Sequence, residues 1–140
     1  MRRNADIVRE GMETWSRGDL DRTIALIDPQ VVWRPITAWP GIQPEYRGHE
    51  GVRRFWSAFR DPWETITLDA DEIRELGERT VLTRSHFRGQ GRASGVETEA
   101  RMYTVWTLED GKLVRFESFT DEAPALEAAE RQEAVRVKGS

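Results

Sequence analysis

The first 60 residues carry apolar side chains at the spacing of amphipathic helices, in three separate stretches. The apolar positions of these stretches are Ile7, Val8, Met12 and Trp15, then Leu20, Ile24 and Ile27, then Val52, Phe55, Trp56 and Phe59. Asn4 and Asp19 are residue types that cap helix N-termini, and Gly18 is placed to end the first helix. Pro29 lies just beyond the second helix, and the third stops near residues 61–62. We therefore predict three helices ahead of residue 63.

From Trp63 onward the spacing changes to the alternation typical of β-strands. Four strands are predicted, with one short strand ahead of the third helix, over residues 65–76, 80–88, 96–108, 112–120 and 31–34. The alternation slips inside the first of the four, which indicates a bulge. Asp110 followed by Gly111 is the strongest hairpin signal in the chain. The segment 35–48 holds three prolines and is predicted to be a loop.

The order of these elements predicts the fold class. Three helices grouped ahead of a four-strand meander favour an α+β layer fold. Because three helices do not fit flat on so narrow a sheet, we expect a cone-shaped, curved antiparallel sheet wrapped around the three N-terminal helices. Such a cone encloses a pocket with one open mouth. We expect a single domain over residues 1–140, with a polar helix or tail over about 121–140 that starts near Asp121 and Pro124.

Composition narrows the class of protein. With 21 basic and 25 acidic residues the formal net charge is −4, so neither nucleic acid nor a membrane surface is an expected partner. No stretch approaches the roughly eighteen apolar residues of a membrane helix. Zero cysteines and two histidines leave no expected metal site and no expected cofactor. The lack of cysteine also fits a reducing compartment, so we expect a cytoplasmic protein.

The chain is rich in aromatic residues, with six Trp, five Phe and two Tyr. Those on helix faces serve as core and pocket wall together, because the core of a cone surrounds its cavity. Trp39, Tyr46 and Trp63 lie in or beside loops, where a role at the pocket mouth is favoured. The residues expected to line the pocket are Trp15, Arg34, Trp39, Tyr46, Trp56, Phe59, Trp63, Phe87, Met102, Thr104, Trp106, Phe116 and Ser118.

Four stretches together carry a family resemblance: WSRGDL at 15–20, VVWRP at 31–35, YRGHEGVRRFW at 46–56 and VWTLEDGK at 105–112. In these the chain resembles the SnoaL-like family of the nuclear transport factor 2-like, or ketosteroid-isomerase-like, superfamily. The resemblance implies a cone-shaped α+β barrel and a homodimer formed through the outer face of the sheet. It implies no single reaction, because the fold serves isomerases, cyclases, epoxide hydrolases, dehydratases and non-enzymes.

The catalytic positions of those relatives are filled here by residues of other chemistry. Arg34 matches the aspartate base of the steroid isomerases, and a guanidinium group cannot act as a base at ordinary pH. Gly11 matches the isomerase tyrosine, and Thr104 matches its protonated acid, or Tyr103 in a register one residue longer. Ser118 matches the aspartate of the epoxide hydrolases. The catalytic residues are therefore unknown.

Several charged residues have both a functional and a structural interpretation. Arg34 either contacts a ligand oxygen at the cavity floor or pairs with an acid. His86 is the side chain that titrates nearest neutral pH, and it faces a dimer partner or solvent if Phe87 faces the cone. The strand carboxylates are expected on the outer face of the sheet in cross-strand ion pairs with arginines: Glu97, Glu99 and Glu117 with Arg101 and Arg115.

The leading hypothesis is a homodimeric, cofactor-independent domain that binds a small, hydrophobic, polyketide- or steroid-like molecule in an aromatic pocket. If it is an enzyme, isomerisation or ring closure by proton transfer suits such a cavity, with Arg34 and a hydroxyl group stabilising negative charge. The alternative is a non-catalytic ligand-binding or dimerisation module.

Overall fold

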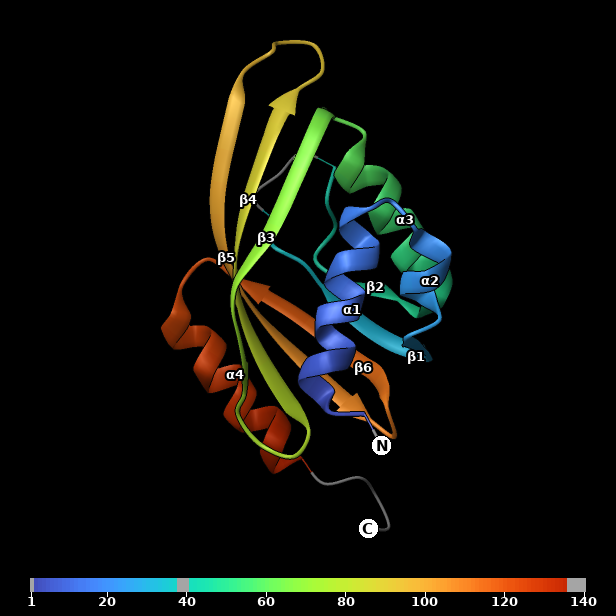
Figure 1. Cartoon of the computed structure of the whole chain (residues 1–140), viewed down its shortest axis with the longest axis vertical. Coiled ribbons are helices and arrows are strands. Elements are labelled where there is room, and N and C mark those ends of the chain that lie inside the picture. The colour runs from blue at the N-terminus through green and yellow to red at the C-terminus, as the bar shows by residue number, and fades with distance from the viewer. Residues whose placement is uncertain (1, 38–40, 136–140) are drawn as a thin grey trace.

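The computed structural model describes residues 2–37 and 41–135. Its elements along the chain are α1 (Asn4–Ser16), α2 (Leu20–Ile24), β1 (Ile27–Arg34), β2 (Tyr46–Arg47), α3 (Gly48–Arg60), β3 (Trp63–Glu75), β4 (Thr80–Gly91), β5 (Glu97–Glu109), β6 (Lys112–Phe119) and α4 (Glu122–Ala134) (Figure 1).

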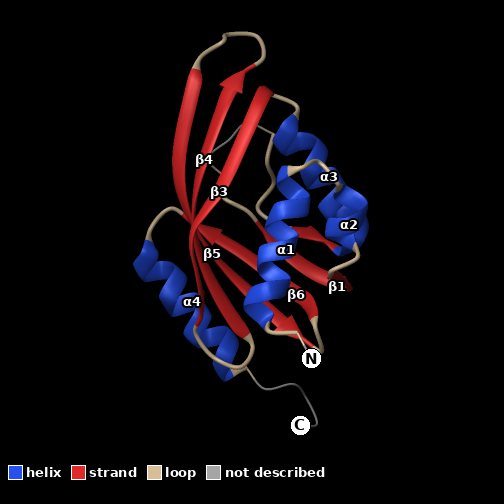
Figure 2. Ribbon diagram, in the orientation of Figure 1, coloured by secondary structure: helices blue, strands red, loops and turns tan. Residues whose placement is uncertain are grey.

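The strands form one sheet of six strands in the order β2-β1-β6-β5-β4-β3. Neighbouring strands are antiparallel except β1 and β6, which run parallel. Figure 2 shows α1, α2 and α3 gathered on one face of the curved sheet and α4 on the other face. The predicted α+β fold, with a curved sheet around three N-terminal helices, is confirmed.

Two of the predicted helix signals act as expected and one does not. Gly18 adopts a positive φ of 79° directly after α1, a conformation that glycine reaches without strain. The Asp19 side chain caps α2 by accepting a hydrogen bond of 3.3 Å from the backbone N–H of Arg22. Asn4 is instead the first residue of α1, and the start of that helix is capped from β3, where Glu75 accepts from the backbone N–H of Ala5 at 3.1 Å.

The second helix is shorter and the first strand longer than the sequence predicts. Helix α2 ends at Ile24, and Ile27 is already part of β1, which runs through Pro29. Pairing with β6 explains the change, because Ile27 lies opposite Leu113 and the carbonyl oxygen of Leu26 accepts a hydrogen bond from the Leu113 N–H at 3.0 Å. The spacing of apolar residues in one segment contains no information about a partner strand that lies more than 80 residues away.

The bulge expected in the first strand of the meander is present. Strand β3 shifts its register against β4 between Ala70 and Glu72. Such a shift adds local twist, which helps a sheet curl around the helices that it covers.

The apolar side chains form two clusters, one on each face of the sheet. The larger cluster lies between the sheet and α1–α3. The smaller one lies under α4, where Ala125, Ala128 and Ala129 pack on Leu82 and Val105. The C-terminal helix, expected to be polar, therefore has one fully buried alanine face. Within the described part of the chain, no helix is long and apolar enough to span a membrane.

Candidate functional site

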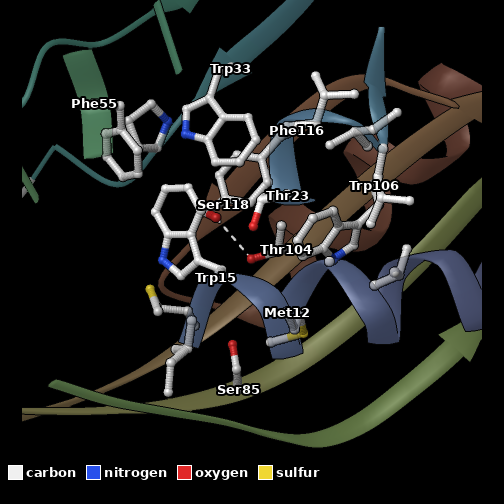
Figure 3. A pocket seen from close by; sticks show the side chains of 18 of the residues that line it. Met12, Trp15, Thr23, Trp33, Phe55, Ser85, Thr104, Trp106, Phe116 and Ser118 are labelled. Carbon is white, nitrogen blue, oxygen red and sulfur yellow. Dashed lines mark hydrogen bonds between the residues drawn. The ribbon is translucent and has the colours of Figure 1, made fainter. Parts of the chain in front are cut away.

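A cavity lies between the inner face of the sheet and the N-terminal helices (Figure 3). The cavity volume is about 80 Å³, whereas a cavity that holds one water molecule needs about 10–15 Å³. Its described walls are built by Ile7, Val8, Gly11, Met12, Trp15, Thr23, Leu26, Ile27, Trp33, Pro35, Ile36, Phe55, Phe59, Leu68, Ser85, Met102, Thr104, Trp106, Leu108, Leu113, Phe116 and Ser118. The cavity therefore has room for a small organic molecule.

Strand alternation explains which residues of the sheet line the cavity. On β5, Met102, Thr104 and Trp106 occupy every second position and all point inward. The register of β5 against β6 sets Thr104 opposite Ser118 and Trp106 opposite Phe116. This is the register in which Thr104, and not its neighbour Tyr103, faces the cavity.

The polar atoms of the wall are mainly hydroxyl groups. Thr104 Oγ1 and Ser118 Oγ share a hydrogen bond of 2.8 Å near the middle of the cavity (Figure 3). The Ser85 side chain points into the same space from β4 (Figure 3). The fourth hydroxyl of the wall, that of Thr23, is already hydrogen-bonded, because it lies 2.7 Å from the hydroxyl of Thr14 and 3.1 Å from the carbonyl oxygen of Asp19.

Among the described residues that line the cavity, none carries an ionisable side chain. Alternation again gives the reason: Ser85 and Phe116 face inward, so their neighbours His86 and Glu117 face outward, where they lie beside Glu99 and Arg34. Within the same part of the chain, no three His, Asp or Glu side chains gather as a metal site requires. What the wall offers chemically is apolar contact and neutral hydrogen bonds.

Aromatic rings in contact form one side of the cavity. Trp33 stacks on Phe116 with ring centroids 3.8 Å apart and an angle of 5° between the planes. Trp106 meets Phe116 edge to face at 5.0 Å, and Trp15 stacks on Trp33 at 5.7 Å. Rings held by several neighbours keep their orientation, so this side of the cavity is a preformed apolar surface.

The residues predicted to line the pocket divide into three groups. Seven of them lie along the cavity: Trp15, Phe59, Met102, Thr104, Trp106, Phe116 and Ser118. Five of them are placed elsewhere: Arg34, Tyr46, Trp56, Trp63 and Phe87. Trp39 lies outside the described residues.

Arg34 lies on the outer side of the sheet. Its guanidinium group is 2.6 Å from a carboxylate oxygen of Glu45 and 3.7 Å from one of Glu117. Hydrogen bonds from Arg47 and Arg34 hold the pKa of Glu45 below its ordinary value, despite an opposing contribution from burial. Since Trp33 points into the cavity, Arg34 next to it must point away. The structure thus supports the structural interpretation of Arg34 as the partner of an acid.

Tyr46 and Trp63 pack against other side chains and do not ring the cavity mouth. Tyr46 belongs to the short strand β2, where pairing with β1 draws it inward to 4% exposure against Phe55. Trp63 meets Phe87 edge to face at 5.2 Å. A Cβ atom at Gly89 would lie 2.8 Å from Trp63, so the glycine makes room for that ring.

Trp56 forms the outer layer of the aromatic core. Its ring meets Trp15 edge to face at 4.6 Å, and the guanidinium group of Arg60 lies 4.8 Å from its centroid. Trp56 therefore supports a cavity residue from behind and is not part of the described wall.

The chain was compared with models of known protein families. The model of the SnoaL-like domain matches residues 8–116, which run from α1 to β6. The chain belongs to the SnoaL-like domain family. No curated protein matches it.

Solved structures with the same fold include several NTF2-like proteins. An NTF2-like protein from Burkholderia thailandensis is 28% identical with a TM-score of 0.78, over 93% of this chain and 98% of its own. An NTF2-like protein of unknown function from Burkholderia pseudomallei is 27% identical with a TM-score of 0.77, over 96% and 100%. TerC, co-crystallised with polyporic acid, is 20% identical with a TM-score of 0.74, over 89% and 96%. This SnoaL-like domain thus has the NTF2-like fold.

Both histidines of this SnoaL-like domain lie away from the cavity. His86 Nε2 is 3.1 Å from a carboxylate oxygen of Glu99 on the outer face of the sheet. His49 Nε2 lies 2.7 Å from the carbonyl oxygen of Ile27, and so it braces the start of α3 against β1.

Two important wall residues were not among the predicted ones. Ser85 shares a face with Val81 and Phe87 in the strand pattern, so the alternation contained the signal that it points inward. Trp33 alternates with Arg34, so only one of the pair could face the cavity. Choosing between them required the partner strand, which the sequence pattern does not show.

Proposed function

We propose that this SnoaL-like domain is a binding protein for a small, largely apolar and uncharged molecule, such as a cyclic or polyketide-like compound. The observation that carries this proposal is a cavity with an aromatic side and a few hydroxyl groups. Such lining is typical of sites that bind organic molecules by apolar burial and orient them by a few hydrogen bonds.

Reversible binding is favoured over catalysis by proton transfer. An isomerase or cyclase of that type needs a side chain that accepts and returns a proton near neutral pH. The side chains of the described wall carry polar hydrogens only on hydroxyl groups and on the indole nitrogens of Trp15, Trp33 and Trp106. Solved structures described as putative polyketide cyclases share the fold. TerC, which also shares it, was co-crystallised with a small organic molecule, polyporic acid. These relatives support small-molecule binding.

Two further parts of the hypothesis remain predictions. We infer a homodimer through the outer face of the sheet, which the resemblance to SnoaL-like proteins implies. We also propose a cytoplasmic location, and the absence of cysteine is the observation that supports it.

Binding is tested by titrating uncharged ring ketones, lactones and steroids while following Trp fluorescence and thermal unfolding. Trp15, Trp33 and Trp106 line the cavity, so an occupant changes their emission. A ligand at 100 times its Kd stabilises the folded chain by about 2.7 kcal/mol.

The variant Ser85→Leu fills the cavity from β4 and should abolish both signals, whereas Ser57→Leu on the exposed side of α3 should leave them unchanged. If no compound alters fluorescence or melting temperature, the binding function is wrong.

A further inference from the structure

The hydrogen bonds of the Thr104 and Ser118 hydroxyls leave part of their capacity unused. Thr104 and Ser118 together carry two hydroxyl hydrogens, and the 2.8 Å hydrogen bond between them uses one. The other has no acceptor among the described residues, so the pair offers the cavity one O–H donor together with unused lone pairs. Either residue can be the inward donor, because the two hydroxyls can reverse their roles.

A second hydroxyl faces the same space. Ser85 makes no hydrogen bond to any described residue, although its side chain is only 2% exposed. It lies opposite Met102 in the β4–β5 register, and Thr104 is the next inward residue of β5. Ser85 and Thr104 are therefore diagonal neighbours on the inner face of the sheet, and both belong to one polar strip across β4, β5 and β6.

Charge is absent from the cavity on every side that the structure describes. On each element of the wall, the ionisable side chain next to a lining residue is itself not part of the lining: Glu10 on α1, Arg22 on α2, Arg34 on β1, Arg54 on α3, Asp69 on β3, His86 on β4, Arg101 on β5 and Glu117 on β6. A ligand that carried a charge into this space would lose its water and gain no opposite charge. That loss is far larger than the gain from the few neutral hydrogen bonds that the hydroxyl and indole groups of the wall offer.

We infer that the cavity selects its ligand by protonation state: a weak acid such as a phenol binds only in its uncharged form, with its oxygen on the Thr104–Ser118 pair. The inference rests on the proposed binding function and names the ligand class more narrowly, as uncharged ring compounds that bear a hydroxyl or carbonyl oxygen. Above the pKa of the free phenol, the apparent affinity then falls about tenfold for each pH unit, because only the protonated fraction binds.

The pH dependence is tested with 4-nitrophenol and its methyl ether, 4-nitroanisole, from about pH 6 to about pH 9. The ether cannot ionise, so its affinity should stay constant. The affinity for 4-nitrophenol should fall with pH, and the bound molecule should keep the absorption band of the neutral phenol. Equal affinity for the phenolate form, with the yellow phenolate band in the complex, overturns the inference and leaves the binding function standing.

The anchoring pair is tested with p-cresol and p-xylene, which differ by one hydroxyl group. Because either hydroxyl alone still donates to a ligand, both are removed together: we expect the double variant of Thr104→Val with Ser118→Ala to weaken the binding of p-cresol about 3- to 10-fold and to leave that of p-xylene within about 2-fold. Thr107→Val removes a buried hydroxyl that is not part of the cavity wall and should change neither affinity.

An equal loss for both compounds would show that the pair serves packing alone, and that outcome overturns its role as the anchor. If none of the four compounds binds the unchanged chain, both the proposed function and this inference fail.

Discussion

Thr83 and Thr107 are both almost completely buried, but their hydroxyl groups have opposite surroundings. The Thr83 hydroxyl accepts a hydrogen bond of 2.9 Å from the indole N–H of Trp106. The Thr107 hydroxyl has no partner among the described residues. A hydroxyl that is buried without a partner has lost its hydrogen bonds to water without replacement.

We therefore expect Thr107→Val to raise the free energy of unfolding by about 1 kcal/mol, because valine keeps the shape and removes the unpaired hydroxyl. Thr83→Val leaves a buried indole N–H without its acceptor and should lower that free energy by about 1–2 kcal/mol. Urea denaturation measures both values. A similar loss in the two variants would contradict this account of Thr107.

Trp33 and Arg34 show where prediction at the residue scale ends. Their alternation means that only one of them faces the cavity, and the sequence contains both possibilities. Parallel pairing decides the matter, because it sets Trp33 beside Phe116 on the inner face and Arg34 beside Glu117 on the outer face. The partner strand lies more than 80 residues away, so no local pattern contains this choice.

At the scale of elements, one carboxylate ties helix α4 to the sheet. Glu133 accepts hydrogen bonds from the backbone N–H of Glu78 at 2.8 Å, from that of Arg79, and from the Thr80 hydroxyl at 2.9 Å. Burial acts to raise the pKa of Glu133, but these hydrogen bonds outweigh it and lower the pKa overall. The buried residues of α4 are alanines, and Arg79 also donates to the carbonyl oxygen of Gln132 at 2.8 Å, so polar contacts at the C-terminal end of α4 add to its attachment.

Because the pKa of Glu133 is lower in the folded than in the unfolded chain, its stabilisation is complete above pH 4.5 and is lost as the pH falls through the lowered value. We expect Glu133→Gln to lower the free energy of unfolding by about 1 kcal/mol at neutral pH and to reduce its loss toward acid. Urea titrations from about pH 7 to about pH 3 measure this. Glu130→Gln, on the exposed side of α4, is the matched control, and equal pH slopes in the two variants would argue against the role of Glu133.

At the scale of the whole molecule, the outer face of the sheet divides into a covered and an open part. Helix α4 covers the part around Leu82 and Val105. Beyond it, His86, Glu99 and Arg101 belong to a surface that carries both signs of charge. In the two-fold dimer that we propose, the same patch meets itself, so a surface with both signs of charge allows opposite charges to pair across the axis.

The homodimer predicted for this face has a direct test in sedimentation. At micromolar concentration we expect twice the 16.2 kDa mass of one chain. Arg101→Glu should weaken the dimer, because it places an acid among the acids of the open face, whereas Arg9→Glu on the exposed side of α1 should leave it intact. A single 16.2 kDa species for the unchanged chain would rule out the dimer.

The sequence by itself determined the types and order of the elements except the short strand β2, which lies in the predicted loop, because helical spacing and strand alternation are local properties that each segment carries within itself. Three amphipathic helices ahead of an alternating meander sufficed to predict the α+β class and a pocket between the curved sheet and the helices. The tertiary structure alone decided which residues line that cavity. Either side of β1 could have faced the helices, and its parallel pairing with β6 set Trp33 inward and Arg34 outward. The neutrality of the described wall follows from the same pairings, since each strand has two faces and only its neighbours select the one that is buried.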